Sequence, residues 1–331
     1  MTNKPRVFVT RRIHPEAEAK LAEAADVEFW QESTPPSKQT LLEKLPAING
    51  LITMLSDPID AEVIGAGVPD LKVIAQMAVG YDNIDITTAT TNGIPVGHTP
   101  GVLTETTADF AWALMMAAAR RVIEADNEVR GGRWQPWGPD VLTGMDVYGK
   151  TLGIIGLGRI GKAMARRARG FSMQVIYFDN HRDPEAEAEL DVEYSPLGEL
   201  LTRSDFVSIH LYYSPEVHHL FNRDRLSQMK STAVLVNTAR GAIVDPDALF
   251  EALQSGQIGA AGIDVFDPEP IPAGHPILKL KNLVITPHIA SASKETRQKM
   301  AFMTVENILA GLNGQPLPYC ANPQVYDSDR S

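Results

Sequence analysis

The sequence contains a single cysteine, Cys320, among its 331 residues. One cysteine cannot close an intrachain disulfide, and it excludes a thiolate metal cluster and a CxxC redox pair. A chain of this length buries enough apolar surface to fold without such cross-links. At roughly 150 residues per domain, the length corresponds to about two domains.

Long hydrophobic runs and an excess of positive charge are missing as well. The longest apolar run covers residues 110–119, far short of the ~20 residues that a membrane-spanning helix needs. Near the N-terminus the apolar run is only 7–9, with Arg11 and Arg12 close behind, which does not fit a signal peptide. The 30 Lys and Arg against 41 Asp and Glu give a net charge of −11, which argues against nucleic-acid and anionic-membrane partners. We therefore expect a cytoplasmic protein that binds neither.

Short apolar runs alternate with amphipathic stretches, a rhythm typical of parallel, doubly wound sheets. The first series predicts four strands, over 7–9, 27–30, 51–54 and 73–75, with helices between them. The second series predicts six strands, the size of a complete dinucleotide-binding sheet. These strands are expected over 152–155, 174–178, 206–209, 233–236, 260–265 and 283–285. The fold class is therefore predicted to be α/β, with two doubly wound parallel-sheet domains.

Long helices are predicted on either side of the second series. One is expected over 104–129, before Gly131 and Gly132, and the other over 294–312. Their positions make them candidates for the joints between two domains. The tail after Pro318 is polar and is expected to be irregular.

A glycine-rich turn comes directly after the first strand of the second series. Gly156, Gly158 and Gly161 form the pattern GxGxxG between the buried strand 152–155 and an expected helix. The first glycine permits the tight turn, the second lets the backbone approach a pyrophosphate, and the third lets helix and strand pack closely. The helix N-terminus offers N–H groups and a positive dipole end to the phosphates. This context predicts a dinucleotide site rather than a plain turn.

Asp179 ends the next expected strand, at about the spacing at which this fingerprint places an acid for the ribose 2′-hydroxyl. The alternative is that Asp179 simply caps the strand end. Asn180, His181 and Arg182 come next, and a nearby arginine is what a 2′-phosphate requires. NAD(H) is therefore the favoured coenzyme, with NADP(H) as the alternative.

Three ionisable residues, Arg240, Glu269 and His288, come after the last three expected strands. Ligands of such sheets bind outside the carboxyl ends of the strands, so these residues share an edge with the glycine-rich turn. Arginine grips a planar carboxylate with two hydrogen bonds, histidine can deliver a proton near neutral pH, and a carboxylate behind it stabilises its charged form. With a nicotinamide, these groups suffice to reduce a 2-oxo acid. The alternatives are a surface arginine, a solvated glutamate and a histidine satisfied at a strand end.

No metal site is predicted from the sequence. His218 and His219 are adjacent and suggest a metal pair at first sight. Side chains of consecutive residues point in different directions, however, and no acidic cluster accompanies the two histidines.

Taken together, these motifs resemble the D-isomer-specific 2-hydroxyacid dehydrogenases, and within them the glyoxylate/hydroxypyruvate reductases. The similarity extends over nearly the whole chain. It is carried by the segments 79–85, 99–104, 156–161, 237–241, 264–266 and 287–289. Several separate motifs in the same order make the match specific.

The resemblance implies a subunit of two domains. A Rossmann coenzyme domain, which binds the dinucleotide, would cover 100–289. A flavodoxin-like catalytic domain, which binds the substrate, would be discontinuous and cover 1–99 and 290–331. Family members are usually homodimers built around the coenzyme domains, so a homodimer is expected.

The resemblance also assigns roles to individual residues. The catalytic set would be Arg240, Glu269 and His288. Substrate binding would involve Leu55, Ser56, Val79, Gly80, Arg240 and Trp137, with the substrate carboxylate on backbone N–H groups near Val79 and Gly80. Coenzyme contacts would come from Thr104, Gly156, Gly158, Arg159, Ile160, Gly161, Asp179, Asn180, His181, Arg182, His210, Pro215, Thr238, Ala239, Asp264, His288 and Ala290.

Two features depart from the pattern of the family. Relatives usually have a proline-containing loop where this chain places Tyr212 and Tyr213, two bulky side chains beside the expected coenzyme contacts. Ala290 replaces a glycine that is common after the histidine motif. Trp137, by contrast, matches the position at which some glyoxylate/hydroxypyruvate reductases send a tryptophan into the pocket of the neighbouring subunit. Its alternative role is that of an aromatic residue buried in a dimer interface.

The predicted activity is the NAD(P)H-dependent reduction of small 2-oxo acids, glyoxylate and hydroxypyruvate above all, to 2-hydroxy acids. His288 would protonate the new alkoxide with the help of Glu269, and Arg240 would stabilise the developing negative charge. The enzymatic alternative is a D-lactate-type or other D-2-hydroxyacid dehydrogenase. The alternative from another class is an NADH-sensing corepressor on the same fold, which would bind NADH with little turnover.

Overall fold

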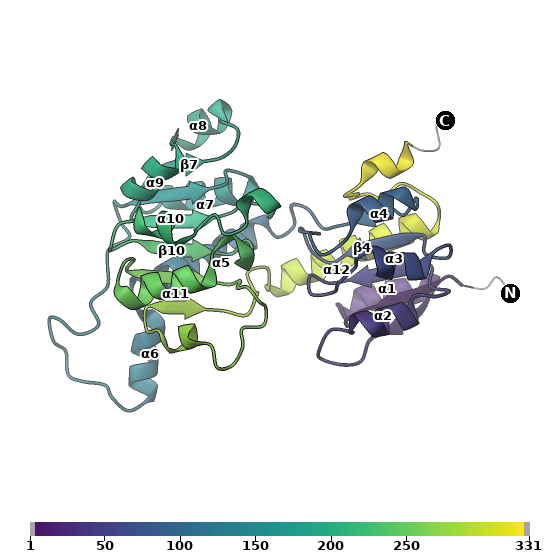
Figure 1. The fold of residues 1–331 in the computed structure, drawn as a ribbon, viewed down its shortest axis with the longest axis horizontal. Helices are drawn as coiled ribbons and strands as arrows, with labels where there is room; N and C mark the ends of the chain where they lie inside the picture. The colour runs from purple at the N-terminus through teal and green to yellow at the C-terminus, as the bar shows by residue number, and fades with distance from the viewer. Residues whose placement is uncertain (1–3, 328–331) are drawn as a thin grey trace. The chain divides into compact units, whose positions relative to one another are not determined.

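The computed structural model describes residues 4–327, and the chain folds as two compact units (Figure 1). Unit 1 consists of Met1–Leu103 together with Ala292–Ser331, and unit 2 of Thr104–Ser291. The boundaries expected from the sequence lie at residues 99 and 289. Unit 1 is discontinuous because the chain leaves it after Leu103 and returns to it at Ala292.

Unit 1 contains a five-stranded sheet whose paired strands are all parallel, in the order β2-β1-β3-β4-β5. This is the flavodoxin-like order. The strands are β1 (Arg6–Val9), β2 (Asp26–Phe29), β3 (Gly50–Thr53), β4 (Val73–Gln76) and β5 (Val96–Gly97). The fifth strand was not expected, because two residues are too few for a periodic signal.

Helices cover both faces of the sheet of unit 1. They are α1 (Pro15–Ala24), α2 (Lys38–Lys44), α3 (Ala61–Gly67), α4 (Ile86–Thr91) and α12 (Lys294–Leu312). Apolar residues of α1 and α12 pack on one face with Val7, Val9 and Ile52. Residues of α2, α3 and α4 pack on the other face with Phe8 and Leu51. Two covered faces explain why every residue of β3 and β4 is buried and why apolar residues stand next to one another in both strands.

Unit 2 contains a seven-stranded parallel sheet in the order β12-β11-β10-β9-β6-β7-β8. Counted from β6, six of the strands have the Rossmann order, and β12 adds one more at the edge. The strands are β6 (Thr151–Ile155), β7 (Gln174–Phe178), β8 (Val192–Tyr194), β9 (Phe206–Ile209), β10 (Val234–Asn237), β11 (Ala260–Ile263) and β12 (Leu283–Ile285). The short edge strand β8 was not expected, since only one of its three residues is buried. The predicted fold class, two doubly wound parallel-sheet domains, is confirmed.

Seven helices of unit 2 lie against the two faces of its sheet or project beyond it. They are α5 (Thr104–Ala119), α6 (Val122–Arg130), α7 (Arg159–Arg169), α8 (Pro184–Leu190), α9 (Leu197–Arg203), α10 (Arg223–Ser227) and α11 (Pro246–Ser255). Buried residues of α5 and α7 share one core with the sheet, and those of α9, α10 and α11 share the other. Within residues 4–327, no helix combines the length and the apolar character that a bilayer crossing requires.

The single helix expected over 104–129 is instead two helices, α5 and α6, and the prediction of one continuous helix is wrong. Arg121, between them, has a left-handed φ of 53°. The reason lies in a distant segment: the Met145 N–H donates to the carbonyl of Ala119 at 2.9 Å. A continuing helix would use that carbonyl for the N–H four residues on. Gly144 makes the approach feasible, since a Cβ there would lie 2.3 Å from the Ala119 oxygen.

The segment after Pro318 is more ordered than expected. Cys320 forms a bridge with Gly97 of β5, and a short 3₁₀ helix covers Pro323–Tyr326. The buried side chain of Asn322 accepts a hydrogen bond from the Val96 N–H at 2.7 Å and donates to the Ile94 carbonyl at 3.1 Å. The tail therefore completes the edge of the sheet of unit 1.

Candidate active site

The glycine-rich loop of unit 2 has the geometry that its sequence predicts. Gly156 has a φ of 94°, which a residue with a Cβ rarely adopts. A Cβ on Gly161 would lie 2.2 Å from the Gly156 oxygen, so only glycine lets α7 approach the loop. A Cβ on Gly158 would meet no heavy atom within 4 Å. Gly158 thus faces open space at the N-terminus of α7, where a pyrophosphate fits.

Asp179 comes directly after β7 and is bonded to this loop. Its Oδ2 accepts a hydrogen bond from the Leu157 N–H at 2.8 Å. Oδ1 has no hydrogen bond to the described part of the chain, and it can accept one from a ribose hydroxyl. A shallow pocket opens here, lined by Leu157, Gly158, Asp179, His181, Arg182, Asp183, Pro184 and Glu185.

Arg182 lies in the same pocket but is held by another residue. Its Nε and Nη2 donate to the two carboxylate oxygens of Glu187 in α8, each at 2.7 Å. The same carboxylate accepts from the Tyr177 hydroxyl at 2.7 Å. The bond from Arg182, followed by that from Tyr177, lowers the pKa of Glu187, and burial raises the pKa of Tyr177 to about 12. Both charges of the Arg182–Glu187 pair therefore persist at neutral pH.

The remaining residues proposed to contact the coenzyme also lie in unit 2, mostly where strands end. Arg159 and Ile160 begin α7, and Thr104 begins α5. Asn180 and His181 follow β7, and His210 and Pro215 follow β9. Thr238 and Ala239 follow β10, Asp264 follows β11, and Ala290 comes after β12. Thr238 stands out because its Oγ1 is buried without a hydrogen-bond partner, a costly state that a bound ligand or a water would relieve.

Arg240 comes after β10, and a network of short-range bonds sets its position. Asn237 donates from Nδ2 to the Arg240 carbonyl at 2.9 Å, and its Oδ1 accepts from the Ala239 N–H at 3.0 Å. The guanidinium Nη1 donates to the Ala239 carbonyl at 2.8 Å. A Cβ on the next residue, Gly241, would lie 2.0 Å from the Phe266 carbonyl carbon. This glycine therefore lets the loops after β10 and β11 come together.

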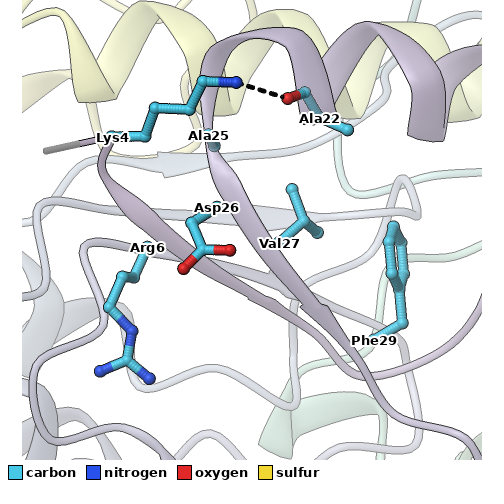
Figure 2. Close-up of a pocket in the computed structure, with 7 residues that line it drawn as sticks. All are labelled: Lys4, Arg6, Ala22, Ala25, Asp26, Val27 and Phe29. Atoms are coloured by element: carbon cyan, nitrogen blue, oxygen red, sulfur yellow. Dashed lines mark hydrogen bonds between the residues drawn. The ribbon is translucent and has the colours of Figure 1, made fainter. Parts of the chain in front are cut away.

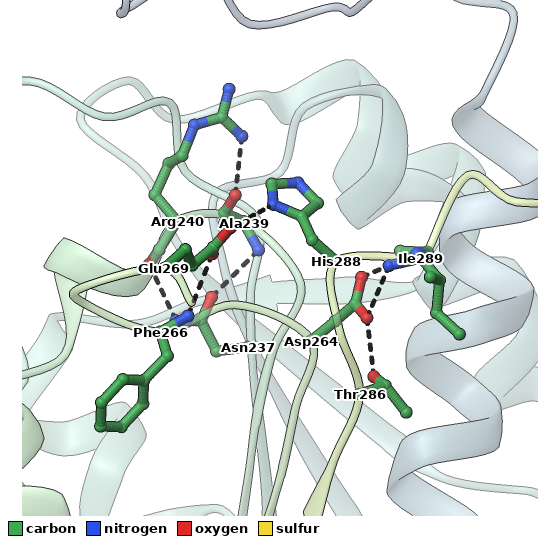
Figure 3. Close-up of polar contacts among 10 residues, drawn as sticks. Asn237, Ala239, Arg240, Asp264, Phe266, Glu269, Thr286, His288 and Ile289 are labelled. Carbon is green, nitrogen blue, oxygen red and sulfur yellow. Dashed lines mark hydrogen bonds and ion pairs between the residues drawn. The ribbon is translucent and has the colours of Figure 1, made fainter. Parts of the chain in front are cut away.

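Glu269 and His288 form a hydrogen-bonded pair at this edge of the sheet (Figure 3). The distance from Glu269 Oε2 to His288 Nδ1 is 2.8 Å. The other oxygen of Glu269, Oε1, accepts from the Phe266 N–H at 3.1 Å, so the carboxylate is fixed at both ends. The imidazole therefore turns Nδ1 to the carboxylate and keeps Nε2 for a reacting group.

The backbone of His288 is strained and is held in place by Asp264. His288 has a φ of 56°, which a residue with a Cβ adopts at a cost of order 1–3 kcal/mol unless its surroundings fix it. The buried Asp264 carboxylate accepts from the Thr286 hydroxyl at 2.6 Å, the Ile289 N–H at 2.8 Å and the Ala290 N–H at 2.7 Å. These bonds surround His288 (Figure 3). In this structure Asp264 thus positions the His288 loop, besides any contact with a coenzyme.

The substrate-binding residues expected in unit 1 also lie just beyond strand ends. Leu55 and Ser56 come after β3, and Val79 and Gly80 after β4. The structure adds three side chains to these loops that the sequence did not single out. Gln76, Asn83 and His98 hydrogen-bond to carbonyl groups of the loops. Asn83 lies in a segment that the resemblance rests on, but nothing in a single sequence reveals which carbonyl groups it contacts.

Buried polar atoms without partners concentrate at the same edge of unit 1. Within residues 4–327, five buried side-chain atoms have no hydrogen-bond partner, on His14, Asp57, Gln76, Thr99 and Thr238. The first four belong to unit 1, each at or after the carboxyl end of a strand. Since buried polar atoms in folded proteins nearly always have a partner, this cluster marks a place for a polar ligand or ordered water.

A larger hollow in unit 1 lies at the opposite end of the sheet (Figure 2). It is lined by Lys4, Arg6, Ala22, Ala25, Asp26, Val27 and Phe29. Arg6 and Asp26 begin β1 and β2, and the Lys4 ammonium donates to the Ala22 carbonyl at 3.0 Å. Ligands of parallel sheets bind at the carboxyl ends of the strands, so this hollow is not a candidate for the active site.

His218 and His219 stack on each other, with ring centroids 3.9 Å apart. The Tyr213 hydroxyl lies 3.2 Å from His218 Nδ1. Among the residues that the structure describes, no group of three or more His, Cys, Asp and Glu side chains is arranged to hold a metal ion. The two rings form a stacked pair.

Trp137 lies outside the sheet edge, in the segment 131–149 that comes after α6. Figure 1 shows α6 and this segment projecting from the layers of unit 2. Trp137 is 88% exposed and Trp134 77% exposed in the single chain. Val122 and Ile123 of α6 are also about half exposed. So large an exposed apolar surface is typical of an interaction site.

Comparison with known proteins agrees with this geometry. Residues 112–290 match the family model of the D-isomer specific 2-hydroxyacid dehydrogenase, NAD binding domain. A glyoxylate reductase of Korarchaeum cryptofilum (strain OPF8) is 53% identical over 323 residues, which cover 97% of each chain.

Solved structures with the same fold are also similar in sequence. The TT0316 protein from Thermus thermophilus is 47% identical, with a TM-score of 0.90 over 96% of this chain and 99% of the other. An NADPH-dependent glyoxylate/hydroxypyruvate reductase from Sinorhizobium meliloti, in complex with NADP and malonate, is 30% identical, with a TM-score of 0.84 over 97% and 98%. The chain therefore belongs to the D-isomer specific 2-hydroxyacid dehydrogenase family, with the NAD binding domain of that family in unit 2.

Proposed function

We propose that this enzyme reduces glyoxylate and related small 2-oxo acids, such as hydroxypyruvate, to 2-hydroxy acids with a reduced nicotinamide coenzyme. The observation that carries the proposal is the Glu269–His288 pair, 2.8 Å apart at the same sheet edge as the glycine-rich loop. The relative from Korarchaeum cryptofilum, named a glyoxylate reductase, supports the choice of substrate.

The residues of unit 2 fit a dinucleotide. The open space at Gly158 and the N–H groups at the start of α7 would hold the pyrophosphate. Asp179 would hold the adenosine ribose, and Thr238 has a buried hydroxyl still to be satisfied. When bound, the reduced nicotinamide supplies the hydride for the carbonyl carbon of the substrate.

His288 is the proposed proton donor. Because Nδ1 faces Glu269, Nε2 is the atom that would deliver the proton to the developing alkoxide. The Glu269 carboxylate fixes the orientation of the ring through its contact with Nδ1. Arg240 would bind the substrate carboxylate and carbonyl oxygen, which stabilises negative charge as it develops.

Unit 1 is proposed to bind the substrate carboxylate. The backbone N–H groups of Val79 and Gly80 have no acceptor within the described chain, so both are available to an anion. Leu55 and Ser56 would line the pocket. We accordingly assign residues 1–99 and 290–331 as the substrate-binding domain and 100–289 as the dinucleotide-binding domain.

NADH is the proposed coenzyme, with NADPH as the alternative. The Asp179 carboxylate suits a ribose 2′-hydroxyl and repels a 2′-phosphate. Arg182, the nearest arginine that a 2′-phosphate would need, is already paired with Glu187 through two bonds. The Sinorhizobium meliloti relative is named NADPH-dependent, so a protein of this fold can also use the phosphorylated coenzyme.

We further propose a homodimer that covers the exposed apolar surface of α6 and residues 131–149. In an isologous dimer each copy of Trp137 lies where it can reach the partner subunit, and there it would help to shape the substrate pocket. A cytoplasmic location is proposed on the sequence expectation alone.

Initial rates on a panel of 2-oxo acids with NADH and NADPH test the proposal. We expect the highest kcat/KM with glyoxylate or hydroxypyruvate and NADH. Faster turnover of pyruvate would favour a D-lactate-type dehydrogenase. Tight NADH binding without turnover of any 2-oxo acid would favour a coenzyme sensor and overturn the proposed reaction.

A further inference from the structure

We propose that His98, Gln76 and Asn83 form a clamp that aims backbone N–H groups of the loop 78–83 at the substrate carboxylate. None of the three needs to touch the substrate, so they are positioning residues. The inference rests on the proposed function, because the clamp has a purpose only if this loop binds a carboxylate. The hydrogen bonds on which the clamp rests join residues of unit 1.

His98 fixes the first peptide of the loop. Its Nδ1 lies 2.9 Å from the Val79 carbonyl oxygen, and a carbonyl only accepts, so Nδ1 carries a hydrogen in this contact. The Val79–Gly80 peptide is trans. In a trans peptide the C=O and the N–H point in opposite directions. By holding the Val79 carbonyl, His98 therefore turns the Gly80 N–H away from itself and out of the loop.

Gln76 fixes the next peptide in the same way. Its Nε2 donates to the Gly80 carbonyl at 3.3 Å and to Asn83 Oδ1 at 2.7 Å. Holding the Gly80 carbonyl turns the Tyr81 N–H in the opposite direction. The N–H groups of Val79, Gly80 and Tyr81 donate to no acceptor in residues 4–327. Consecutive N–H groups without an acceptor form a ready site for an anion when hydrogen bonds to the carbonyl groups of the same peptides fix their direction.

Asn83 ties the loop 78–83 to the loop after β3, which contains Leu55 and Ser56. Its Nδ2 donates to the carbonyl groups of Met54 at 3.0 Å and Asp57 at 2.8 Å. Its own carbonyl accepts from the Ile59 N–H at 3.0 Å. The residues proposed to line the pocket, Leu55 and Ser56, lie between the two carbonyl groups that Asn83 binds. One amide therefore sets the spacing of both loops.

The clamp itself is held from behind by α12. The buried Asn307 donates from Nδ2 to the His98 carbonyl at 3.0 Å. Gly97 allows this approach, since a Cβ there would lie 2.6 Å from the Asn307 side chain. The imidazole also meets the Tyr81 ring edge-on, with centroids 5.3 Å apart. These contacts fix the ring that holds the Val79 carbonyl.

Unsatisfied polar atoms next to the clamp point independently to a polar ligand. Gln76 Oε1, Asp57 Oδ1 and Thr99 Oγ1 have no hydrogen-bond partner, and each of the three residues is 0% exposed. Asp57 is anchored through its other oxygen, which accepts from the Thr53 hydroxyl at 2.9 Å and the Met54 N–H at 2.7 Å. Thr99 holds the start of the loop, donating from its N–H to the Ala78 carbonyl at 2.8 Å.

The test compares two substitutions at one position that differ in a single donor. His98→Asn keeps an N–H near the place of Nδ1, and His98→Leu has nearly the same shape as Asn without the donor. Losing one hydrogen bond that orients the loop should raise the KM for glyoxylate about tenfold in His98→Leu. We expect kcat to change much less, the dissociation constant of NADH to stay unchanged, and His98→Asn to recover most of the loss.

A second pair of probes separates positioning from general damage. The inhibition constant of oxamate, a carboxylate that is not reduced, should rise in parallel with the KM. The KM for the uncharged methyl ester of glyoxylic acid should not rise, because the ester has no carboxylate to bind. A parallel rise for acid and ester would show a merely structural defect and overturn the clamp.

Asn83→Asp provides the independent variant if His98→Leu does not fold. The new carboxylate cannot donate to the carbonyl groups of Met54 and Asp57, so the KM for glyoxylate and the inhibition constant of oxamate should again rise together. Unchanged values in a folded His98→Leu or Asn83→Asp protein would overturn the clamp and leave the proposed reaction standing. Failure of the native enzyme to reduce any 2-oxo acid would overturn the proposed reaction. In that case, the dissociation constants of oxamate for the native and variant proteins, measured by calorimetry, would test the clamp independently of the reaction.

Discussion

The carboxyl edges of the two sheets present different kinds of chemistry. In unit 2 the edge carries ionisable side chains, and Glu269 holds His288 through a charge-assisted contact. In unit 1 the edge carries backbone N–H groups, oriented by neutral side chains such as Gln76 and Asn83. The difference teaches that one fold class can supply a reacting group or a binding surface, depending on the residues that its strands lead into.

The two edges nevertheless use the same device for order. In unit 2 the Asp264 carboxylate holds the loop around the strained His288. In unit 1 the Asn83 amide holds the carbonyl groups on either side of Leu55 and Ser56. In both units a side chain thus fixes a backbone loop through hydrogen bonds. That side chain is a carboxylate in unit 2 and a neutral amide in unit 1.

The largest expected effect breaks the chemistry of unit 2 alone. His288→Ala removes the proposed proton donor, and such groups contribute about 10²–10⁴-fold to the rate. We expect a loss of that size in kcat for glyoxylate, with the dissociation constant of NADH nearly unchanged. The control is His218→Gln, a histidine of unit 2 outside the site. Turnover close to the native rate would refute the assignment of His288.

Coenzyme choice tests whether a single carboxylate of unit 2 acts through its charge. Asp179→Ser removes the repulsion of a 2′-phosphate, so the ratio of kcat/KM for NADPH to that for NADH should rise at least about tenfold. Asp224→Ser, in α10, is the matched control and should leave the ratio unchanged. If the native enzyme already prefers NADPH, Asp179 does not hold the ribose and the interpretation of this pocket is wrong.

Trp137 tests whether a third region contributes to the site. Pocket walls act through size, and one methylene group is worth ~1–3 kcal/mol of discrimination. Trp137→Ala should therefore reduce the preference for glyoxylate over a phenyl-substituted 2-oxo acid, with Trp134→Ala as the control. A dissociated dimer with unchanged substrate ranking would assign a purely structural role to Trp137. An intact dimer with unchanged ranking would place it on an ordinary surface.

The smallest expected effect concerns acid stability. His210, beside the glycine-rich loop, is held against Ser208 at 2.8 Å, and burial lowers its pKa from 6.5 to about 3. Between pH 6.5 and about 3, His210 therefore carries a proton in the unfolded chain but not in the folded chain. Stability should fall as the pH drops from 6.5 towards 3, by at most ~1.4 kcal/mol per pH unit from this group.

His210→Gln, which keeps a polar atom near Ser208, should reduce this pH dependence. Urea midpoints at about pH 7 and about pH 5, on either side of the ordinary histidine pKa, measure it, with the exposed His181 replaced by Gln as the control. We expect a smaller fall between the two pH values in His210→Gln than in the native and control proteins. An equal fall in all three proteins would show that His210 does not carry the effect.

The sequence points to more side chains of the candidate site in unit 2 than of the proposed binding surface in unit 1. Arg240, Glu269 and His288 are recognisable because the proposed reaction uses their side chains and because they come after buried strands. The strain at His288 and the contacts of Asp264 could not be foreseen, since they depend on loops that meet only in the folded chain. The same holds for Gln76, Asn83 and His98, whose targets are carbonyl groups that have no signature in a sequence. The break after α5 was missed for a related reason, because the Met145 N–H, from a distant segment, takes the Ala119 carbonyl. The strands β5 and β8 were missed because they are short and carry too little periodic signal.

The discontinuity of unit 1 has a consequence for the order in which the protein is made. A chain grows from its N-terminus, and domains usually fold as they emerge. All of unit 2 is contiguous, whereas the face of the first sheet at Val73 and Ala75 stays uncovered until Met300 and Ile308 of α12 have been synthesised. The unit that begins the chain is therefore the last to be completed. Late in translation, a ribosome carries a finished nucleotide-binding unit together with a half-built one.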